Sequence, residues 1–173
     1  TVSSKYLFRR PWLTVRCEDM LLPNGNHIPE YYILEYPDWV NTIAITKEGK
    51  FVFVRQYRPG IGRTCYELCA GVCEKEDVSP LVSAQRELWE ETGYGNGNWQ
   101  EYMVVSANPS THTNLTHCFL ATDVELIDHQ HLEATEDISV HLFTLEEVRT
   151  LLENNEIMQS LNAAPLWKYM ASL

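Results

Sequence analysis

Positive charge is scarce in this sequence. Its 173 residues include 13 Lys and Arg against 24 Asp and Glu, which gives a formal net charge of −11 at pH 7. This excess of negative charge weakens attraction to nucleic acid phosphates and to anionic lipids. We therefore expect neither a nucleic acid nor a membrane partner. An acidic protein still binds an anionic small molecule where arginines or divalent cations reverse the local potential.

Long apolar runs are also missing, and we do not expect a secreted protein. No apolar stretch approaches the length of a transmembrane helix, and the first residues do not resemble a charged start followed by an apolar signal core. The five cysteines are an odd number, so the sequence does not favour a disulfide framework. We expect a reduced, cytoplasmic protein. Cys65, Cys69 and Cys73 lack a CxxC pair and a fourth ligand, which favours buried thiols over a zinc site.

No linker, repeat or low-complexity segment divides the chain. Hydrophobic residues make up 45% of it, and 173 residues suffice to bury one core without disulfides or metals. We therefore predict one domain over residues 1–173, in which residues 1–38 form an N-terminal strand and hairpin segment.

Turn residues separate the expected strands. Asn24-Gly25 is a strong tight-turn signal and predicts an antiparallel hairpin over residues 14–35. A second hairpin is expected from residues 39–46 and 51–57, on either side of the polar turn at 47–50. Stretches rich in β-branched and aromatic residues predict further strands at residues 64–69, 99–106, 115–122 and 138–143.

Helix signals are fewer. Ser79 as N-cap and Pro80 at the first position predict a helix that runs through Thr92 and ends at Gly93. A second helix begins with the capping box of Thr144 and Glu147, and its inner face carries Leu145, Val148, Leu151 and Leu152. A last short helix is expected near residues 163–172. Strands with interspersed helices indicate an α+β fold with helices packed on a mixed sheet.

The first helix carries an unusual set of acidic residues. At helical spacing Leu81, Ala84 and Leu88 form an apolar stripe, and the adjoining face carries the carboxylates of Glu87, Glu90 and Glu91. Like charges at this spacing destabilise an isolated helix by about 0.2–0.5 kcal/mol per pair, and the nearby helix C-terminus disfavours negative charge further.

Two interpretations of this acidic face are open. One is a solvated surface, partly relieved by Arg86 one turn from Glu90. The other is a site for Mg²⁺ or Mn²⁺, since hard cations prefer oxygen ligands and supply the positive charge that the helix lacks.

The stretch Arg86-Glu87-Leu88-Trp89-Glu90-Glu91-Thr92-Gly93, with Gly71 upstream and Tyr94 after it, resembles the signature box of the Nudix hydrolase family. In that pattern a glycine, five residues, a glutamate and seven residues precede the core. Here one residue is inserted, so Val78 stands where the first glutamate belongs. Glu76 or Asp77 would have to replace it, mainly to support Arg86.

Three further stretches resemble the ADP-ribose pyrophosphatase branch of the family. They are the N-terminal hairpin, which resembles a segment exchanged between subunits, "VRQYRPG" (54–60) leading into "YELCAG" (66–71), and "EDISVHLFTLEEV" (136–148). Cys69 stands where that branch usually has proline. The resemblance implies an α/β/α sandwich, a homodimer, and cleavage of a nucleoside diphosphate linked to another moiety. ADP-ribose is the leading substrate, with AMP and ribose 5-phosphate as products.

The resemblance also implies site residues. Glu87, Glu91 and the backbone carbonyl of Ala70 would be ligands of Mg²⁺ or Mn²⁺, and Glu90 would be a ligand or would orient metal-bound water. Arg86 would hold the carboxylates in place and Gly71 would permit a close turn. The chemistry agrees independently, because water attacks a doubly anionic pyrophosphate more readily when cations neutralise it and lower the pKa of the bound nucleophile.

The general base and the substrate contacts are less defined. Glu133 or Glu136, in a loop where related enzymes keep a catalytic glutamate, is a candidate base. Glu136 is preferred, Glu91 is a further possibility, and an exposed acidic loop is the alternative. Substrate contacts are expected from Arg58 at a strand end, where the family places such an arginine, and from Arg55, since a guanidinium grips phosphate bidentately. Glu67 fits an orienting role. His112, Asn114 and His117, in a segment that departs from the branch, are candidate contacts to a sugar or base.

Three alternatives to the ADP-ribose hydrolase remain at this point. Another nucleotide sugar such as GDP-mannose could be the substrate. A non-catalytic Nudix-like module could sense a nucleotide sugar without cleaving it, although the complete set of Glu87, Glu90 and Glu91 favours an enzyme. An acidic protein-interaction domain would bind no specific divalent ion.

Overall fold

The computed structural model describes all residues from 1 to 173 and contains two separate sheets and three helices. The helices are α1 (Pro80–Thr92), α2 (Leu145–Glu153) and α3 (Ser160–Ala171). The strands are β1 (Ser3–Arg10), β2 (Leu13–Leu21), β3 (His27–Glu35), β4 (Trp39–Thr46), β5 (Phe51–Arg58), β6 (Arg63–Glu67), β7 (Cys69–Val72), β8 (Tyr94–Gly95), β9 (Asn98–Val105), β10 (Thr116–Leu126) and β11 (Ile138–Phe143).

The larger sheet is mixed, as predicted. Its main path runs β11-β5-β4-β10-β8, and β6, β7 and β9 pair with β5, β4 and β10 respectively. Strands β4 and β10 are parallel, whereas every other pair is antiparallel. Strands β4 and β5, at its centre, are largely buried.

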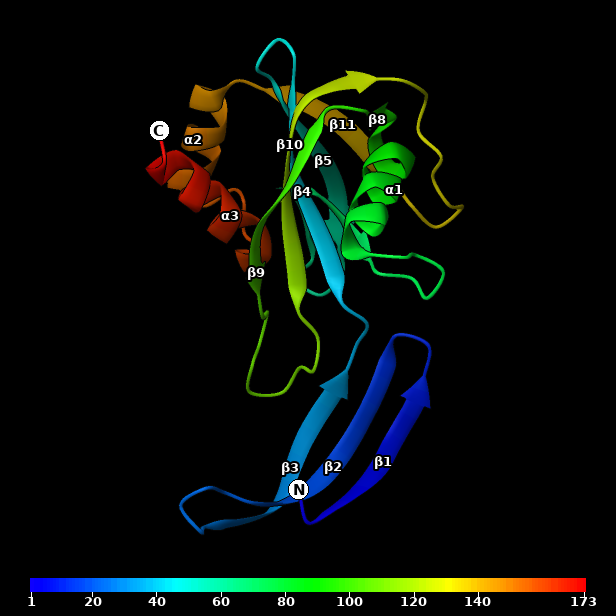
Figure 1. Ribbon diagram of the computed structural model, residues 1–173, viewed down its shortest axis with the longest axis vertical. Helices are drawn as coiled ribbons and strands as arrows, with labels where there is room; N and C mark the ends of the chain where they lie inside the picture. The colour runs from blue at the N-terminus through cyan, green and yellow to red at the C-terminus, as the bar shows by residue number, and fades with distance from the viewer.

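Helices cover both faces of this sheet, with α1 on one side and α2 and α3 on the other (Figure 1). Successive side chains of β4 point to opposite faces of the sheet and pack against different helices. Ile43 packs in a core cluster with residues of α2 and α3, while its neighbour Ala44 packs with Leu88 of α1. This confirms the α/β/α sandwich, because a strand with apolar side chains on both faces needs cover on both.

The ends of α1 and α2 agree with the sequence prediction. The Ser79 hydroxyl accepts a hydrogen bond from the backbone N–H of Val82, and Gly93 ends α1 in the left-handed region at φ 74°. Both hydrogen bonds of the Thr144 and Glu147 capping box are present at the start of α2. These caps satisfy backbone groups that a helix leaves unpaired at its ends.

Helix α3 begins three residues earlier than predicted and contains Pro165. Proline has no N–H, so the carbonyl of Leu161, four residues earlier, receives no helical hydrogen bond from it. The side-chain amide of Asn41 donates to this carbonyl instead, at 2.7 Å. A buried polar residue of β4 therefore compensates for the proline and ties α3 to the sheet.

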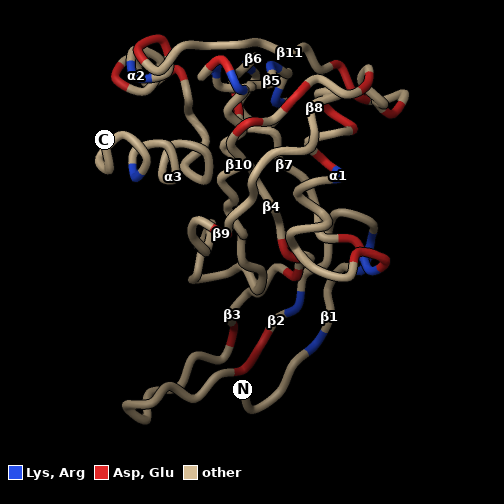
Figure 2. Tube along the Cα trace, turned by 45° about the horizontal axis from the view of Figure 1, so that its top comes forward, with Lys and Arg blue, Asp and Glu red and all other residues tan.

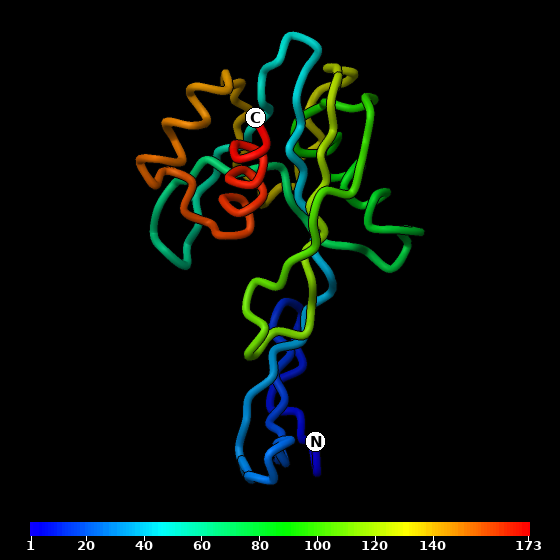
Figure 3. The backbone as a smooth tube through the Cα atoms, turned by 60° about the vertical axis from the view of Figure 1, so that its left-hand side comes forward, coloured from blue at the N-terminus to red at the C-terminus, as the bar shows by residue number.

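The N-terminal segment is a three-stranded antiparallel sheet, β1-β2-β3, which extends away from the rest of the molecule (Figures 1 and 3). Strands β2 and β3 form the predicted hairpin around Gly25, whose φ is 84°. Strand β1 pairs with β2 on the other side and completes the sheet. Leu34 in β3 exchanges backbone hydrogen bonds with Thr111 and Thr113, so the segment 106–115 contacts this sheet.

The strand predicted at residues 64–69 is two strands in the structure. Strand β6 pairs with β5 and β7 pairs with β4, so the chain changes neighbours at the buried Leu68. Cys65 and Cys69 are buried on these two strands and Cys73 is half-buried. No helix is both long enough and apolar enough to cross a membrane.

Candidate active site

The acidic face of α1 lies against β7. The backbone N–H of Val72 donates to Oε1 of Glu87, and that of Ala70 donates to Oε2 of Glu91, each at 3.2 Å. Figure 2 shows acidic positions on α1 and on the loops beside it. The two carboxylates are therefore held at the edge of the sheet by main-chain donors on both sides of Gly71.

Gly71 leaves space for one of these carboxylates. A Cβ at this position would overlap the carboxylate of Glu87. Gly71 is a residue of β7 and does not adopt a left-handed φ, so the expected requirement for a close turn is wrong. Glycine is required at position 71 because it has no side chain, and not because it allows an unusual backbone conformation.

Arg86 links the acidic residues. One guanidinium nitrogen donates to Oε1 of Glu87 and to Oε2 of Glu90, both at 3.0 Å. The other nitrogen donates to the carbonyl of Val72 at 3.0 Å. One cation thus offsets repulsion between neighbouring carboxylates and joins α1 to β7.

Asp77 is a further partner of Arg86. Its Oδ2 accepts hydrogen bonds from Arg86 at 3.0 Å, from the Ser83 hydroxyl at 2.8 Å and from the N–H of Glu74 at 3.2 Å. The sequence left Glu76 and Asp77 as alternatives. The structure brings Asp77 to Arg86, whereas Glu76 is exposed and the side chain of Val78 points into solvent with 89% exposure.

Arg58 and Glu67 form a second paired unit near the carboxylates. Glu67 is only 2% exposed, and both of its oxygens accept hydrogen bonds from Arg58, one of them from Nε at 2.8 Å. The pKa of Arg58 is raised chiefly by its hydrogen bond to Glu67, and the negative charge of Glu91 adds to the effect. Arg58 therefore lies within the field of the acidic site, in a fixed orientation.

Arg55 does not join this group. It is three residues from Arg58 on β5 and therefore faces the opposite side of the sheet. Its guanidinium lies over the ring of Tyr66, which packs on the α2 and α3 side. There it lines a separate cavity with Arg63 and Glu156. Of the two predicted arginines, only Arg58 lies on the side of the sheet that carries the carboxylates of α1.

Burial in the acidic site disfavours the charged form of its carboxylates. Glu91 is 5% exposed, and burial, with repulsion from Glu87, raises its pKa to about 8. Burial likewise raises the pKa of Glu87. A bound cation would restore the charged forms, and the ligand atoms on offer are carboxylate oxygens, which hard divalent cations prefer. The residues present therefore fit a divalent cation.

A cavity of about 230 Å³ borders this site. Arg58, Ala70 and Gly71 line it on one side, and its other walls include polar and apolar side chains from β4, β10 and α3: Trp39, Asn41, Thr116, Leu161 and Asn162. Three buried oxygens among them lack a hydrogen-bond partner, namely Asn41 Oδ1, Thr116 Oγ1 and Asn162 Oδ1. Buried polar groups are normally paired, so these atoms leave hydrogen-bonding capacity for a ligand or water.

The geometry agrees with comparisons to known proteins. Residues 36–163 match the family model described as NUDIX domain, and residues 1–34 match the nucleoside diphosphate sugar hydrolase N-terminal domain. The chain belongs to the Nudix hydrolase family. This confirms the resemblance seen in the signature box and the expectation of a hydrolase.

Individual relatives cover nearly the whole Nudix chain. It is 31% identical over 164 residues to an ADP-ribose pyrophosphatase of Bacillus subtilis (strain 168), covering 94% of this chain and 88% of that protein. It is 29% identical over 161 residues to a methanol dehydrogenase activator of Bacillus methanolicus, covering 92% and 86%. A crystal structure of an ADP compounds hydrolase superposes with a TM-score of 0.83 at 21% identity, covering 99% and 92%, which confirms the Nudix fold.

The loop between β10 and β11 approaches the end of the Nudix helix α1. The side-chain amide of Gln130 donates to the carbonyl of Glu91 at 2.7 Å. Glu133 and Glu136 lie further along, both exposed, and the N–H of Glu133 donates to the carboxylate of Glu136 at 2.8 Å. The charge of Glu136 contributes to the raised pKa of Glu91, after burial and Glu87. Glu136 therefore lies within electrostatic range of Glu91.

Of the remaining candidates, His112 and Asn114 lie on the segment 106–115 that contacts the N-terminal sheet, and His117 lies on β10. The ring of His112 packs on Tyr36 at 5.1 Å between centroids, and His117 lies between Asp38 and Glu101. Asn114 is buried, and neither polar atom of its side chain has a partner. None of the three lines the cavity beside Ala70.

Sequence reasoning missed the polar side chains that do line the cavity. Thr116, Asn41 and Asn162 come from distant parts of the chain. One local signal was present, because Asn41 interrupts the otherwise largely apolar strand "WVNTIAIT". A polar residue in a strand covered on both faces needs a hydrogen-bonding reason.

Proposed function

We propose that this Nudix hydrolase cleaves the pyrophosphate of a nucleoside diphosphate linked to another moiety, with ADP-ribose as the preferred substrate and AMP and ribose 5-phosphate as products. The observation that carries this proposal is that Ala70 and Val72, which line the cavity together with Arg58, hold the carboxylates of Glu91 and Glu87 through their backbone N–H groups. The name of the relative from Bacillus subtilis supports the choice of ADP-ribose.

Divalent cations are the cofactors that this site fits. Nudix hydrolases generally depend on them, and the proposed ligands for Mg²⁺ or Mn²⁺ are Glu87, Glu91 and the carbonyl of Ala70, with Glu90 as a ligand or as an orienter of bound water. When bound, such a cation neutralises pyrophosphate charge and lowers the pKa of bound water. Arg86 keeps Glu87 and Glu90 in place through its two hydrogen bonds.

Arg58 is the proposed phosphate contact. Its guanidinium is oriented by the buried Glu67, which leaves it pre-organised for an anion beside the carboxylates. Arg55 was expected to share this role, but it lies on the opposite face of the sheet, so we do not assign it to this site.

A carboxylate is the proposed proton acceptor for the attacking water. Glu136 is preferred, because it lies on a loop anchored to the end of α1 and its charge acts on Glu91. Glu91 itself is the alternative, since its carboxylate is held beside that of Glu87 by the backbone of β7.

The cavity would hold the part of the substrate beyond the pyrophosphate. Asn41, Thr116 and Asn162 offer unpaired buried oxygens to hydroxyl or amino groups of a sugar or base, and Trp39 offers a flat apolar surface. This polar lining supports a nucleotide sugar over a purely apolar ligand.

The homodimer and the cytoplasmic location stay predictions. The three-stranded sheet β1-β2-β3 is the proposed contact between subunits, because it stands apart from the sandwich and exposes Phe8, Trp12 and Leu13. Sedimentation analysis of the chain with and without residues 1–34 would test it, and a monomeric full chain would contradict it.

A substrate panel tests the proposed function. ADP-ribose, GDP-mannose, other nucleoside diphosphate sugars and a dinucleotide are incubated with Mg²⁺ or Mn²⁺, and the products are separated by chromatography. The proposal predicts that ADP-ribose is cleaved with the highest kcat/KM. Preference for GDP-mannose would establish the alternative substrate, and binding of ADP-ribose without cleavage would establish the sensor.

A further inference from the structure

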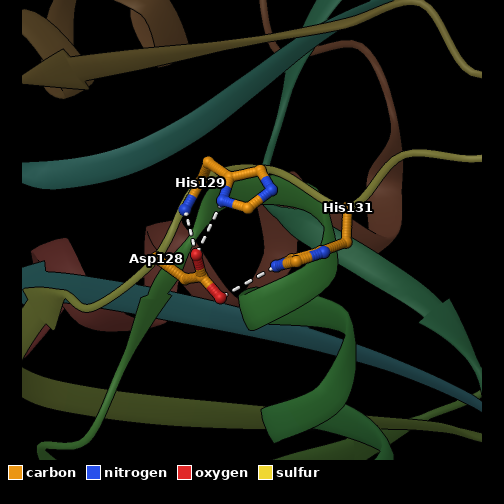
Figure 4. Close-up of side chains that lie close together, drawn as sticks. All are labelled: Asp128, His129 and His131. Carbon is orange, nitrogen blue, oxygen red and sulfur yellow. Dashed lines mark hydrogen bonds and ion pairs between the residues drawn. The ribbon is translucent and has the colours of Figure 1, made fainter.

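A cluster of potential metal ligands lies outside the Nudix carboxylates. Asp128, His129 and His131 follow β10, and their side chains point toward one another in Figure 4. One oxygen of Asp128 is 2.7 Å from Nδ1 of His129, and the other is 2.9 Å from Nε2 of His131. One ligand atom from each residue lies within 4.8 Å of the others.

The backbone that carries these ligands is fixed to the end of α1. The N–H of Asp128 donates to the carbonyl of Gly93 at 3.1 Å, and that of His131 donates to Glu90 at 2.8 Å. The ring of His131 also stacks on Trp89, with 4.1 Å between centroids. Two of the three ligands are therefore pre-organised, which lowers the entropy lost when a ligand or ion binds.

The chemistry of the cluster differs from that of the acidic face. Two imidazoles and one carboxylate suit zinc and the neighbouring first-row metals, whereas Mg²⁺ prefers oxygen ligands alone. Ligand atoms about 2 Å from a tetrahedral zinc ion lie roughly 3.3 Å apart. The separations of 2.7 and 2.9 Å join different oxygens of Asp128 to the two histidines, so the side chains must shift to bring one ligand atom of each residue to that spacing. The C-terminal end of α1, beside the cluster, also favours a nearby cation.

We propose that Asp128, His129 and His131 bind a late first-row divalent cation such as Zn²⁺, at a site separate from the Nudix carboxylates. The exposed side of the cluster leaves further coordination positions to water, since the side chain of His129 is 80% exposed. A bound ion would cross-link the three side chains at the start of the loop 128–137 and hold this part of the loop against α1. That loop carries Glu133 and Glu136, so occupancy would restrict the segment that carries the proposed base.

Calorimetric titration with Zn²⁺ in excess Mg²⁺ tests this site, because Mg²⁺ occupies the oxygen ligands of α1 and leaves the imidazoles free. The wild type is compared with His129→Ala and Asp128→Asn. The matched control is His27→Ala, which removes an exposed histidine paired with Asp19 in the N-terminal sheet. Thermal unfolding without zinc confirms that each variant is folded.

The proposal predicts one zinc ion per chain, at least about tenfold weaker binding in both cluster variants, and unchanged binding in the control. Glu91→Gln should keep zinc binding, which separates this site from the proposed catalytic centre. Hydrogen exchange in residues 128–137 should slow on addition of zinc to the wild type and not to His129→Ala. Zinc binding that is absent, that survives both cluster substitutions, or that is lost with Glu91→Gln would overturn the proposal.

Discussion

The carboxylate of Asp77 pairs with the guanidinium of Arg86, with 3.0 Å between Oδ2 and the terminal nitrogen. These residues are nine positions apart in the chain, whereas the usual Nudix spacing would place the partner at Val78. The inserted residue is absorbed in the loop before α1, which turns Asp77 inward and Val78 outward. The shorter aspartate therefore supplies the contact that the spacing of the box assigns to glutamate.

Asp77→Asn should impair the site through Arg86. The amide retains the shape but loses the charge that opposes the guanidinium, so Arg86 should hold Glu87 and Glu90 less firmly. We expect kcat to fall by about ten- to hundredfold and stability by about 1–3 kcal/mol. Glu76→Gln is the matched control, since Glu76 is exposed. Equal activity of the two variants would contradict this role for Asp77.

Gly71→Ala should displace Glu87. The added methyl group overlaps the Glu87 carboxylate, so either that side chain or β7 must move. Overpacking costs about 1–3 kcal/mol, and a small displacement of a catalytic group costs roughly hundredfold in rate. Gly60→Ala is the control, because nothing lies near the added methyl group and its φ is not left-handed. Measured kcat and Tm should fall for Gly71→Ala alone.

Arg58→Lys should weaken substrate binding, because lysine cannot reproduce the paired hydrogen bonds to Glu67 and to a phosphate. Loss of one charge-assisted hydrogen bond is worth about 1.5–3 kcal/mol, so KM for ADP-ribose should rise roughly ten- to hundredfold. Arg55→Lys, on the opposite face, should leave KM unchanged. Steady-state kinetics of both variants give the comparison, and a larger effect at Arg55 would reverse the assignment.

The stability of the metal-free protein should depend on pH through Glu91. Its pKa rises from the ordinary 4.5 to about 8 because the folded protein buries the carboxyl group. Between these pH values the folded state keeps a proton that the unfolded state has released. The free energy of unfolding therefore falls as pH rises through this window. The stability that depends on protonated Glu91 is fully lost above about pH 8.

Glu91→Gln removes this titration. In EDTA, the variant should gain stability relative to wild type as pH rises from about 4.5 to about 8, because other titrating groups act on both proteins alike. Urea unfolding at a series of pH values measures the difference. Two parallel stability curves would show that Glu91 does not titrate in this range.

Local signals explain which elements the sequence predicted well. Ser79, Pro80 and Gly93 each act on the backbone beside them, and α1 has the predicted bounds. Strand β1 gave no such signal, because all its residues are exposed and no apolar alternation marks a buried face. It becomes a strand by pairing with β2, a contact that local pattern does not reveal.

Long-range geometry explains what the sequence left open in the site. Counting residues could not choose between Glu76 and Asp77, since the choice depends on how the loop bends toward Arg86. The cavity brings together Asn41 of β4 and Asn162 of α3, which are far apart in the sequence. The Nudix box itself was predictable because one helix carries most of it.

In the proposed mechanism, cation binding and cleavage both depend on Glu91. Mn²⁺ binding and ADP-ribose cleavage should be measured on the same preparations of wild type and Glu91→Gln, with folding checked by circular dichroism. We predict that the wild type binds Mn²⁺ and releases AMP and ribose 5-phosphate, and that the folded variant loses both properties. Cleavage that persists in the variant, or in wild type without any divalent cation, would contradict this mechanism.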